Sequence, residues 1–286
     1  MSSTVSVTTR EDRRRARRAR ARRSIAISTV STIVVLGALV TVVVTSPGWD
    51  KVRESFFSAE VFRHSFGQVL EGFWLDVRMF MVIEVVVLAA GLLIALCRIV
   101  QAPALFPLRL LAIVYVDVLR GVPTILVVYL VGFAVPALAL SGVPTGAVFL
   151  GGAALALCYS AYVAEVYRAG IESIHPSQAA AALALGLTQI QALRYVVVPQ
   201  AVRRVVPPLL NDFIALQKDV ALISILGPQE AFRVAQIFAD STFNYTPLLS
   251  AAALYLCVTI PLTRVVDRLQ ARSVRERGAT IALGPR

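Results

Sequence analysis

Charged residues are scarce in this chain, and lysine is almost absent. Charged side chains make up 16% of the 286 residues and hydrophobic ones 57%, whereas a soluble globular domain usually carries about 25% charge. The only lysines are Lys51 and Lys218, and neither follows the glycine spacing of a P-loop, which needs Gly-x-x-x-x-Gly-Lys-Ser/Thr. The composition therefore predicts an integral membrane protein that has no nucleotide-binding motif of its own.

Residues that commonly bind metals or form disulfides are also few. Cys97, Cys158 and Cys257 lie far apart in or beside apolar segments, and the two histidines, His64 and His175, stand alone. This spacing predicts neither a disulfide framework nor a metal site. We also find no paired acid and base and no nucleophile with a base at credible spacing, so the chain is not expected to be an enzyme by itself.

Arginine supplies most of the formal net charge of +11, and nine arginines fall within residues 10–23. A basic chain can bind nucleic acid, but here the arginines gather at the ends of apolar runs, as the positive-inside rule describes. The 21-residue apolar run at 24–44 is too long for a signal peptide. We therefore predict a cytoplasmic basic tail at 1–23, polar and disordered over 1–9, and no nucleic-acid partner. The tail could also contact anionic lipid headgroups.

Apolar runs of about 20 residues mark the spans. We predict an extracytoplasmic or interfacial segment at 45–76, with a helix lying at the interface, and a transmembrane domain at 77–266. The third span is interrupted at residues 120–123, and a basic cytoplasmic tail follows at 267–286. Both termini are then cytoplasmic, and the six predicted spans cover residues 24–44, 77–98, 112–138, 147–167, 209–226 and 247–266.

A polar, arginine-bearing loop at residues 165–199 separates two of these spans. Its Ala181 and Ala182, Gly186 and Pro199 have the spacing of the ATPase-docking loop of ABC importer permeases, which this segment resembles: Glu-Ala-Ala, three residues, Gly, and Pro thirteen residues later. The family's glutamate is replaced by Ala180. Docking here would depend on shape, apolar contact and arginines.

The resemblance extends over residues 161–227 and is specific to the polar amino acid branch of these permeases. Motifs typical of that branch occur in order, at residues 161–165, 170–171, 184–187, 199–201, 207–211 and 218–219, and residues 120–123 resemble its Arg-Gly-Thr-Pro element. One motif departs from the pattern, because Val220 and Ala221 stand where hydroxyl residues are usual.

The resemblance implies an all-α integral membrane protein with the type I ABC importer permease fold, a five-helix core plus an extra N-terminal span, and a cytoplasmic coupling helix. It implies import of a polar or charged amino acid, with glutamate or glutamine as a guess, across the cytoplasmic membrane of a bacterium. The implied partners are a second permease subunit, two cytoplasmic ATPase subunits that bind ATP and Mg, and an extracytoplasmic amino acid-binding protein. No cofactor is expected in this chain. An ion-coupled secondary carrier is the alternative; such carriers often show inverted repeats, and no repeat is evident.

The coupling loop, taken as about 165–204, has its own physical signals. Pro176 suits the first turn of a helix, and Leu183, Leu187 and Ile190 recur at helical spacing as one apolar stripe. Gly186 interrupts this helix and allows a turn. The residues that the resemblance assigns to ATPase coupling are Glu165, Gln178, Ala180, Ala181, Ala182, Gly186, Arg194 and Pro199.

Ionisable side chains inside a span usually face a cavity or a partner, because burial in lipid is costly. Glu84 lies near the centre of the second span and could contact a substrate ammonium group or a basic side chain of a neighbouring helix, with Lys218 as one candidate. Arg120 could pair with Asp117 or line the pathway. The seven-residue spacing of Asn211 with Lys218, and of Asp212 with Asp219, places polar groups on two adjacent helical faces. The predicted pathway residues are Glu84, Asp117, Arg120, Asn211, Lys218 and Asp219.

Overall fold

The structure is a computed structural model that describes the backbone of residues 10–100 and 102–282 and the side chains of residues 23–100 and 102–271. All regular secondary structure in these residues is helical. The chain divides into two compact units, Met1–Phe57 and Ser58–Arg286. The predictions for residues 1–9 and for the arginine side chains of 10–22 and beyond 271 lie outside the described residues.

The first unit holds α1 (Arg10–Val44) and α2 (Trp49–Phe56). The part of α1 from Arg23 to Val44 is 22 residues long, with a mean hydropathy of 2.4 in its most apolar window, and none of that window is buried inside the protein. A helix that is apolar on all sides and exposed on all sides is typical of one surrounded by lipid. The predicted first span is thus a helix of suitable length and composition.

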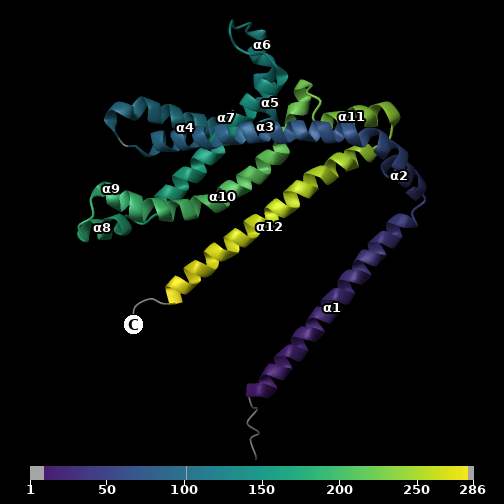
Figure 1. The fold of residues 1–286 in the computed structure, drawn as a ribbon, viewed down its shortest axis with the longest axis horizontal. Coiled ribbons are helices and arrows are strands. Elements are labelled where there is room, and N and C mark those ends of the chain that lie inside the picture. Colours follow the sequence, from purple (N-terminus) through teal and green to yellow (C-terminus); the bar gives the residue numbers. More distant parts are fainter. Residues whose placement is uncertain (1–9, 101, 283–286) are drawn as a thin grey trace, which may run out of the picture. The chain divides into compact units, whose positions relative to one another are not determined.

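The second unit is a set of helices joined by short loops (Figure 1). Their bounds are α3 (Ala59–Ile99), α4 (Phe106–Gly121), α5 (Thr124–Tyr129), α6 (Val135–Ala137), α7 (Ala147–Glu172), α8 (Pro176–Ala184), α9 (Gln189–Ala192), α10 (Val198–Asp219), α11 (Ala231–Thr242) and α12 (Thr246–Ala282). Short 3-10 turns cover Pro103–Leu105 and Val220–Leu226, and π-helical turns cover Leu130–Ala134 and Leu193–Val197.

Helix α3 differs from the predicted interfacial helix followed by a separate span. It is one continuous helix of 41 residues, which at 1.5 Å per residue extends about 60 Å, twice the hydrocarbon thickness of a bilayer. One face of its first half is covered by protein, because Val69 and Phe73 pack against Ala231 of α11 and Ala251 of α12. The aromatic segment that suggested an interfacial helix is therefore partly packed against α11 and α12.

The predicted third span is broken where the sequence indicated. Helices up to Gly121 and from Thr124 onward meet at an angle of 108°. Val122 is extended, with φ −100° and ψ 134°, because the residue before a proline, here Pro123, disfavours the helical region. The sharp bend makes α4 and α5 separate helices (Figure 1).

Among the described residues, four helices are long and apolar enough to cross a membrane, or five if the bent pair is one span. Helix α10, where the fifth span was predicted, carries Arg203, Arg204, Asp212, Lys218 and Asp219. This charge is why α10 does not resemble a simple apolar span. The count of six therefore stays a prediction.

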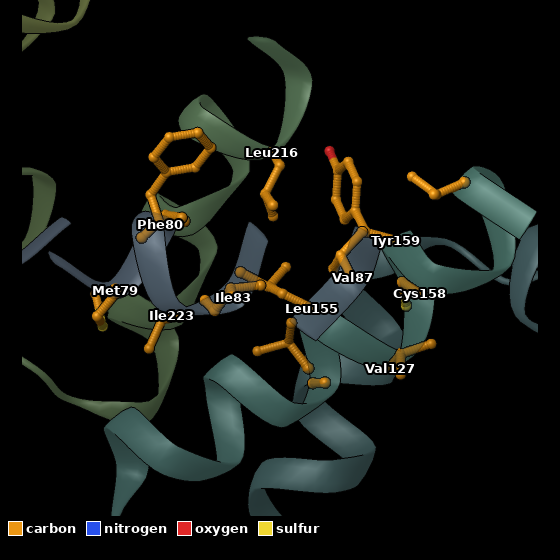
Figure 2. Packing of buried hydrophobic residues seen from close by; sticks show 14 residues of the cluster. Met79, Phe80, Ile83, Val87, Val127, Leu155, Cys158, Tyr159, Leu216 and Ile223 are labelled. Atoms are coloured by element: carbon orange, nitrogen blue, oxygen red, sulfur yellow. The ribbon is translucent and has the colours of Figure 1, made fainter. Parts of the chain in front are cut away.

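The main core lies where α3, α5, α7, α10 and the turn at Val220–Leu226 converge (Figure 2). Ile83 and Val87 of α3 meet Leu155 of α7, with Leu216 and Ile223 completing the cluster. Helices in lipid associate mainly through close packing, so small residues at their contacts matter. Gly91 is one of them: a Cβ there would lie 2.6 Å from Cγ1 of Val163.

Candidate functional site

Glu165 of α7 lies at the centre of an arginine cluster drawn from several helices. Its Oε2 is 2.7 Å from Nη1 of Arg98, at the end of α3, and 3.9 Å from Nη1 of Arg120, at the end of α4. Arg168, one turn further along α7, binds both Glu165 and Glu172. The Arg98 and Glu165 side chains are only 12% and 22% exposed, so this carboxylate ties the ends of α3 and α4 to α7.

An open hollow of about 550 Å³ lies beside this cluster, between α4, α7 and α10. Charged groups of both signs line it: Arg120, Glu165, Arg204 and Asp212. The Arg120 guanidinium also lies over the ring of Tyr162, 5.7 Å from its centroid, a distance at which a cation is attracted to the ring. The hollow therefore presents an aromatic face and opposite charges together, features that a zwitterionic ligand could use.

The hollow joins residues that the sequence had assigned to different roles. Glu165 was predicted to act in coupling and Arg120 in the pathway, yet both line one space. Tyr162 and Arg204 were not predicted as pathway residues. Tyr162 is one helical turn before Glu165, so helical spacing alone could have placed it on the same face. The Arg204 guanidinium donates to the Ser173 carbonyl oxygen, a contact between α10 and the end of α7 that no sequence spacing reveals.

Glu84 is only 8% exposed and has no hydrogen bond or ion pair with any described residue. The charged group that acts on it most is another carboxylate, Asp212 of α10. The expected pairing with a basic side chain of a neighbouring helix is therefore wrong. Lys218, the named candidate, is exposed. Asp212 itself provides a second buried acceptor. Its Oδ2 has no partner among the described residues.

The other predicted pathway residues separate into exposed and half-buried ones. Asp117 is exposed and makes no ion pair with Arg120, which turns to Tyr162 and Glu165 instead; that predicted pair is wrong. Asn211 and Lys218 share an exposed face of α10. Asp219 is half-buried and accepts a hydrogen bond of 2.8 Å from the hydroxyl of Tyr159. The two predicted faces of α10 are therefore present, and they differ in exposure.

The predicted coupling helix is a helical hairpin, α8–turn–α9 (Figure 1). Pro176 occupies the first turn of α8, as predicted, and the N-cap His175 accepts from the Ser177 backbone N–H. Thr188 and Gln191 form a capping box at the start of α9, which satisfies two otherwise unpaired N–H groups. The hairpin therefore has a defined local geometry.

Gly186 makes the turn between the two helices. Its φ is +86°, a left-handed value, and its N–H donates to the Leu183 carbonyl while that of Leu187 donates to the Ala182 carbonyl. This is the Schellman pattern, which favours glycine. A Cβ at Gly186 would have nothing within 4 Å, so the constraint on Gly186 is conformational within this chain.

The hairpin continues into α10 through a π-helical turn. The N–H of Val198 donates to the carbonyl of Leu193, a bond one residue longer than in an α-helix. Pro199 follows directly and lacks an N–H, so it cannot complete the regular ladder; a bulge is a common consequence. Gln178 of α8 accepts from Gln200 of α10 at 3.3 Å, which fastens the hairpin to the longer helix.

Apolar side chains project from this hairpin without covering one another. Leu185, Ile190 and Tyr195 are 85%, 77% and 63% exposed, while Ala182 and Ala192 are nearly fully buried. The predicted single stripe of Leu183, Leu187 and Ile190 is wrong, because α8 ends at Ala184 and these residues fall on two helices and the turn. Ala180, Ala181 and Arg194 are exposed, and the Arg194 guanidinium lies 5.6 Å from the Tyr195 ring centroid.

A bundle of apolar helices with charged groups at its helix ends and an exposed helical hairpin is the architecture of a membrane transport subunit. Residues 88–275 match the family described as the inner membrane component of binding-protein-dependent transport systems. The chain belongs to this family, the permease subunits of ABC importers.

The alignments with two named relatives cover most of the length of each relative. A glutamine transport system permease protein of Rickettsia felis, GlnP, is 30% identical over 72% of this chain and 93% of its own. A glutamine ABC transporter permease protein of Bacillus subtilis, GlnM, is 31% identical over 73% of this chain and 94% of its own.

Two solved structures are similar in fold. The permease chain of the crystal structure of an amino acid ABC transporter with histidines has a TM-score of 0.64 and 31% identity, covering 72% of this chain and 94% of its own. A chain of the inward-facing MetNI methionine ABC transporter has a TM-score of 0.51 and 18% identity, covering 74% and 95%. At 18% identity, the comparison with the methionine transporter shows similarity of fold only.

Proposed function

We propose that this chain is the transmembrane permease subunit of an ATP-driven importer that moves a polar or charged amino acid across a bacterial cytoplasmic membrane. Membership of the permease family supports the transport role. The amino acid class is supported by relatives named as glutamine permeases and by the amino acid transporter of similar structure. Glutamine or glutamate is therefore the first substrate to test.

The observation that carries the energy-coupling part of the proposal is the exposed hairpin. Leu185 and Ile190 are the most exposed large apolar side chains on it, and a helix that presents apolar anchors suits a groove on a partner protein. The partner is an ATPase subunit, because this chain has no P-loop. ATP and Mg are bound and hydrolysed there, so this chain is not an enzyme.

The chemistry at Ala180 sets how such docking works. A glutamate at this position would bring a carboxylate to the interface, and Ala180 brings none. Arg194 and Arg203, both exposed, supply positive charge on the same segment. Docking then depends on apolar contact and on arginine pairing with acidic groups of the ATPase.

The proposed assembly has two permease subunits, two cytoplasmic ATPase subunits and an extracytoplasmic binding protein. Six spans place both termini and the α8–α9 hairpin in the cytoplasm. Closure of the ATPases on ATP moves the two hairpins. The Glu165 cluster passes that movement to α3 and α4, because Arg98 and Arg120 both reach its carboxylate.

The hollow beside Glu165 is the proposed inner part of the substrate path. Arg120 suits the α-carboxylate of an amino acid, and Asp212, with its unpartnered Oδ2, suits the ammonium group. Glu84 interacts electrostatically with Asp212, so it adds a second carboxyl group near this end of the proposed path. Asp117, Asn211 and Lys218 are exposed in the single chain and are positioned to meet a second permease subunit or the path between the two subunits.

The alternative from another class is a secondary carrier driven by an ion gradient. Such a carrier needs no ATPase and no docking hairpin. Co-purification from the native membrane separates the two functions. The importer predicts an ATPase subunit that remains bound to the wild-type chain and is lost when Leu185 and Ile190 are both changed to serine. A complex that forms equally well with and without those side chains would exclude docking at the hairpin.

A further inference from the structure

The start of α11 is fixed to α3 by two carboxyl side chains that are almost completely buried. Glu230, the N-cap of α11, is 0% exposed, and Asp76 of α3 is 2% exposed. The backbones are also in close contact here, because a Cβ at Gly72, one turn before Asp76, would lie 2.7 Å from the nitrogen of Ala231. The two acids therefore face each other in a tightly packed junction.

The hydrogen bonds at this junction use most of the acceptor oxygens. Glu230 accepts from the backbone N–H groups of Phe232 at 2.7 Å and Arg233 at 2.6 Å. Oδ2 of Asp76 accepts from the hydroxyl of Tyr255 at 2.7 Å and from the N–H of Ala231 at 3.3 Å. One set of contacts thus joins α3, α11 and α12.

One oxygen is left over. Oδ1 of Asp76 is buried and has no donor among the described residues, although a buried acceptor without a partner is costly. Glu230 directly precedes Ala231, whose N–H donates to Asp76, so the two buried carboxyl groups are neighbours. An ionised Glu230 has no proton to donate, whereas a protonated Glu230 can donate a hydrogen bond to Oδ1 of Asp76.

No cation neutralises the pair among the described residues. On α11, the guanidinium of Arg233 is held by Gln236 at 3.1 Å. On α3, Arg78 forms no ion pair with either acid, and its Nε donates to the Trp74 carbonyl oxygen at 3.4 Å. His64 of α3 lies edge-on to Phe238 further along α11, and on α12 the facing group is the Tyr255 hydroxyl. Two adjacent buried carboxylates without a cation repel each other, so one of them retains its proton.

We propose that Glu230 and Asp76 form a proton-binding site in which Glu230 holds one proton and donates it to Oδ1 of Asp76. This hydrogen bond fastens α11 to α3 and, through Tyr255, to α12. Release of the proton leaves two negative charges in contact and frees the start of α11. The site makes the packing of α11 depend on pH, whichever substrate the protein carries.

Glu230 lies outside the predicted spans, in the segment that joins the spans at 209–226 and 247–266. Its environment sets the direction of this pH dependence. Burial, and then the negative charge of Asp76, raise the pKa of Glu230 to about 8. A group whose pKa is raised by folding stabilises the folded state fully below its ordinary pKa and loses that contribution as the pH rises through the raised value. The proton is therefore still bound at neutral pH, but the stabilisation that it contributes falls as the pH rises from about 4.5 toward 8 and is lost above about pH 8.

The test uses the full-length chain in its native complex in lipid nanodiscs. Infrared spectroscopy at pH 7 detects protonated carboxyl groups. Amide hydrogen exchange of residues 231–236 between about pH 5.5 and 9.5, corrected for the intrinsic pH dependence, reports the opening of α11. Glu230→Gln keeps the shape and removes the shared proton, whereas Asp76→Asn keeps the shape and removes the negative charge that faces it. Glu71→Gln is the matched control, since Glu71 is an exposed acid on the same helix.

The proposal predicts that one carboxylic acid band is absent from Glu230→Gln, altered in Asp76→Asn and unchanged in Glu71→Gln. Corrected exchange in the wild type should rise by up to about tenfold per pH unit as the pH approaches the pKa of Glu230 from below and should level off above it, and Glu230→Gln should abolish this rise. An unchanged band in Glu230→Gln, or a rise of corrected exchange with pH that persists in that variant, would overturn the proposal. If Glu230→Gln does not fold, Asp76→Asn decides it, because a band and a pH profile identical to those of the wild type would overturn the proposal.

Discussion

Nη1 of Arg98 lies 2.7 Å from Oε2 of Glu165, and this ion pair joins the last turn of α3 to α7. Arg120 and Arg168 approach the same carboxylate, so removing Glu165 would leave arginines facing one another. Glu165 lies on α7 between the core residues of that helix, such as Tyr159 and Val163, and the α8–α9 hairpin that follows it.

Breaking this pair should destabilise the protein more than removing it completely. Glu165→Gln leaves Arg98 partly buried without its partner and should cost about 3 kcal/mol, toward the lower end for buried pairs. The double variant Arg98→Met with Glu165→Gln should recover part of that loss. Apparent unfolding temperatures of the single and double variants in one lipid mixture give the coupling. Additive losses would show that the pair does not act as a unit.

Gly186 should tolerate asparagine better than valine. Its φ of +86° is accessible to glycine and, at lower cost than to other residues, to asparagine, whereas a β-branched side chain is strained there. Gly186→Val should disorder the hairpin and lower substrate-stimulated ATP hydrolysis about tenfold, equal to about 1.4 kcal/mol. Gly186→Asn should keep most of it. Equal activity in both variants would show that the turn geometry is unimportant for coupling.

Gly186→Asp adds a charge to a surface that is open in this chain. Asp tolerates the left-handed region nearly as well as asparagine, so any loss specific to Gly186→Asp comes from the partner surface. We expect transport to be abolished while membrane insertion is normal. Protease accessibility of the inserted chain provides the check on insertion.

The exposed leucine and isoleucine of the hairpin should carry the affinity for the ATPase. Leu185→Ser with Ile190→Ser removes two large anchors and should weaken binding by about 2 kcal/mol or more, as expected for central apolar contacts. Ala184→Ser, an exposed residue of α8, is the matched control. Binding is measured by titrating the purified ATPase into permease-containing nanodiscs. An equal loss in the control would show that a general change in the hairpin, and not its anchors, is responsible.

Glu84 should be dispensable for folding but not for transport. Glu84→Gln removes a buried charge that has no basic partner among the described residues, so the unfolding temperature should not fall. Uptake should slow about tenfold if the carboxylate lines the path, equal to about 1.4 kcal/mol. Lys218→Met tests the exposed face of α10 in the same assay. Wild-type uptake in both variants at equal expression would remove these residues from the pathway.

Much of the fold could be predicted because apolar runs, prolines and glycines act locally. The helix at 24–44, the break before Pro123, the start of α8 at Pro176 and the turn at Gly186 all follow from neighbouring residues. Helix α11 was not predicted, and neither was the continuity of α3. Both depend on burial of Val69 and Phe73 against distant segments.

The contacts of the site were harder to predict for the same reason. Resemblance pointed to Glu165 and Arg120, but not to their shared carboxylate contact or to the hollow with Asp212. Spacing placed Asp117 near Arg120, yet side-chain direction decided that Arg120 turns to Tyr162. Pairings between helices that are far apart in sequence need the tertiary structure.

The central claim is that this chain imports an amino acid by coupling to a separate ATPase. It is tested most directly by uptake of radiolabelled glutamine and glutamate into proteoliposomes that contain the complex purified through this chain, together with its binding protein. We predict that uptake requires internal ATP and Mg, and is lost in Leu185→Ser with Ile190→Ser while Ala184→Ser behaves as the wild type. Uptake driven by an ion gradient without ATP would contradict the account.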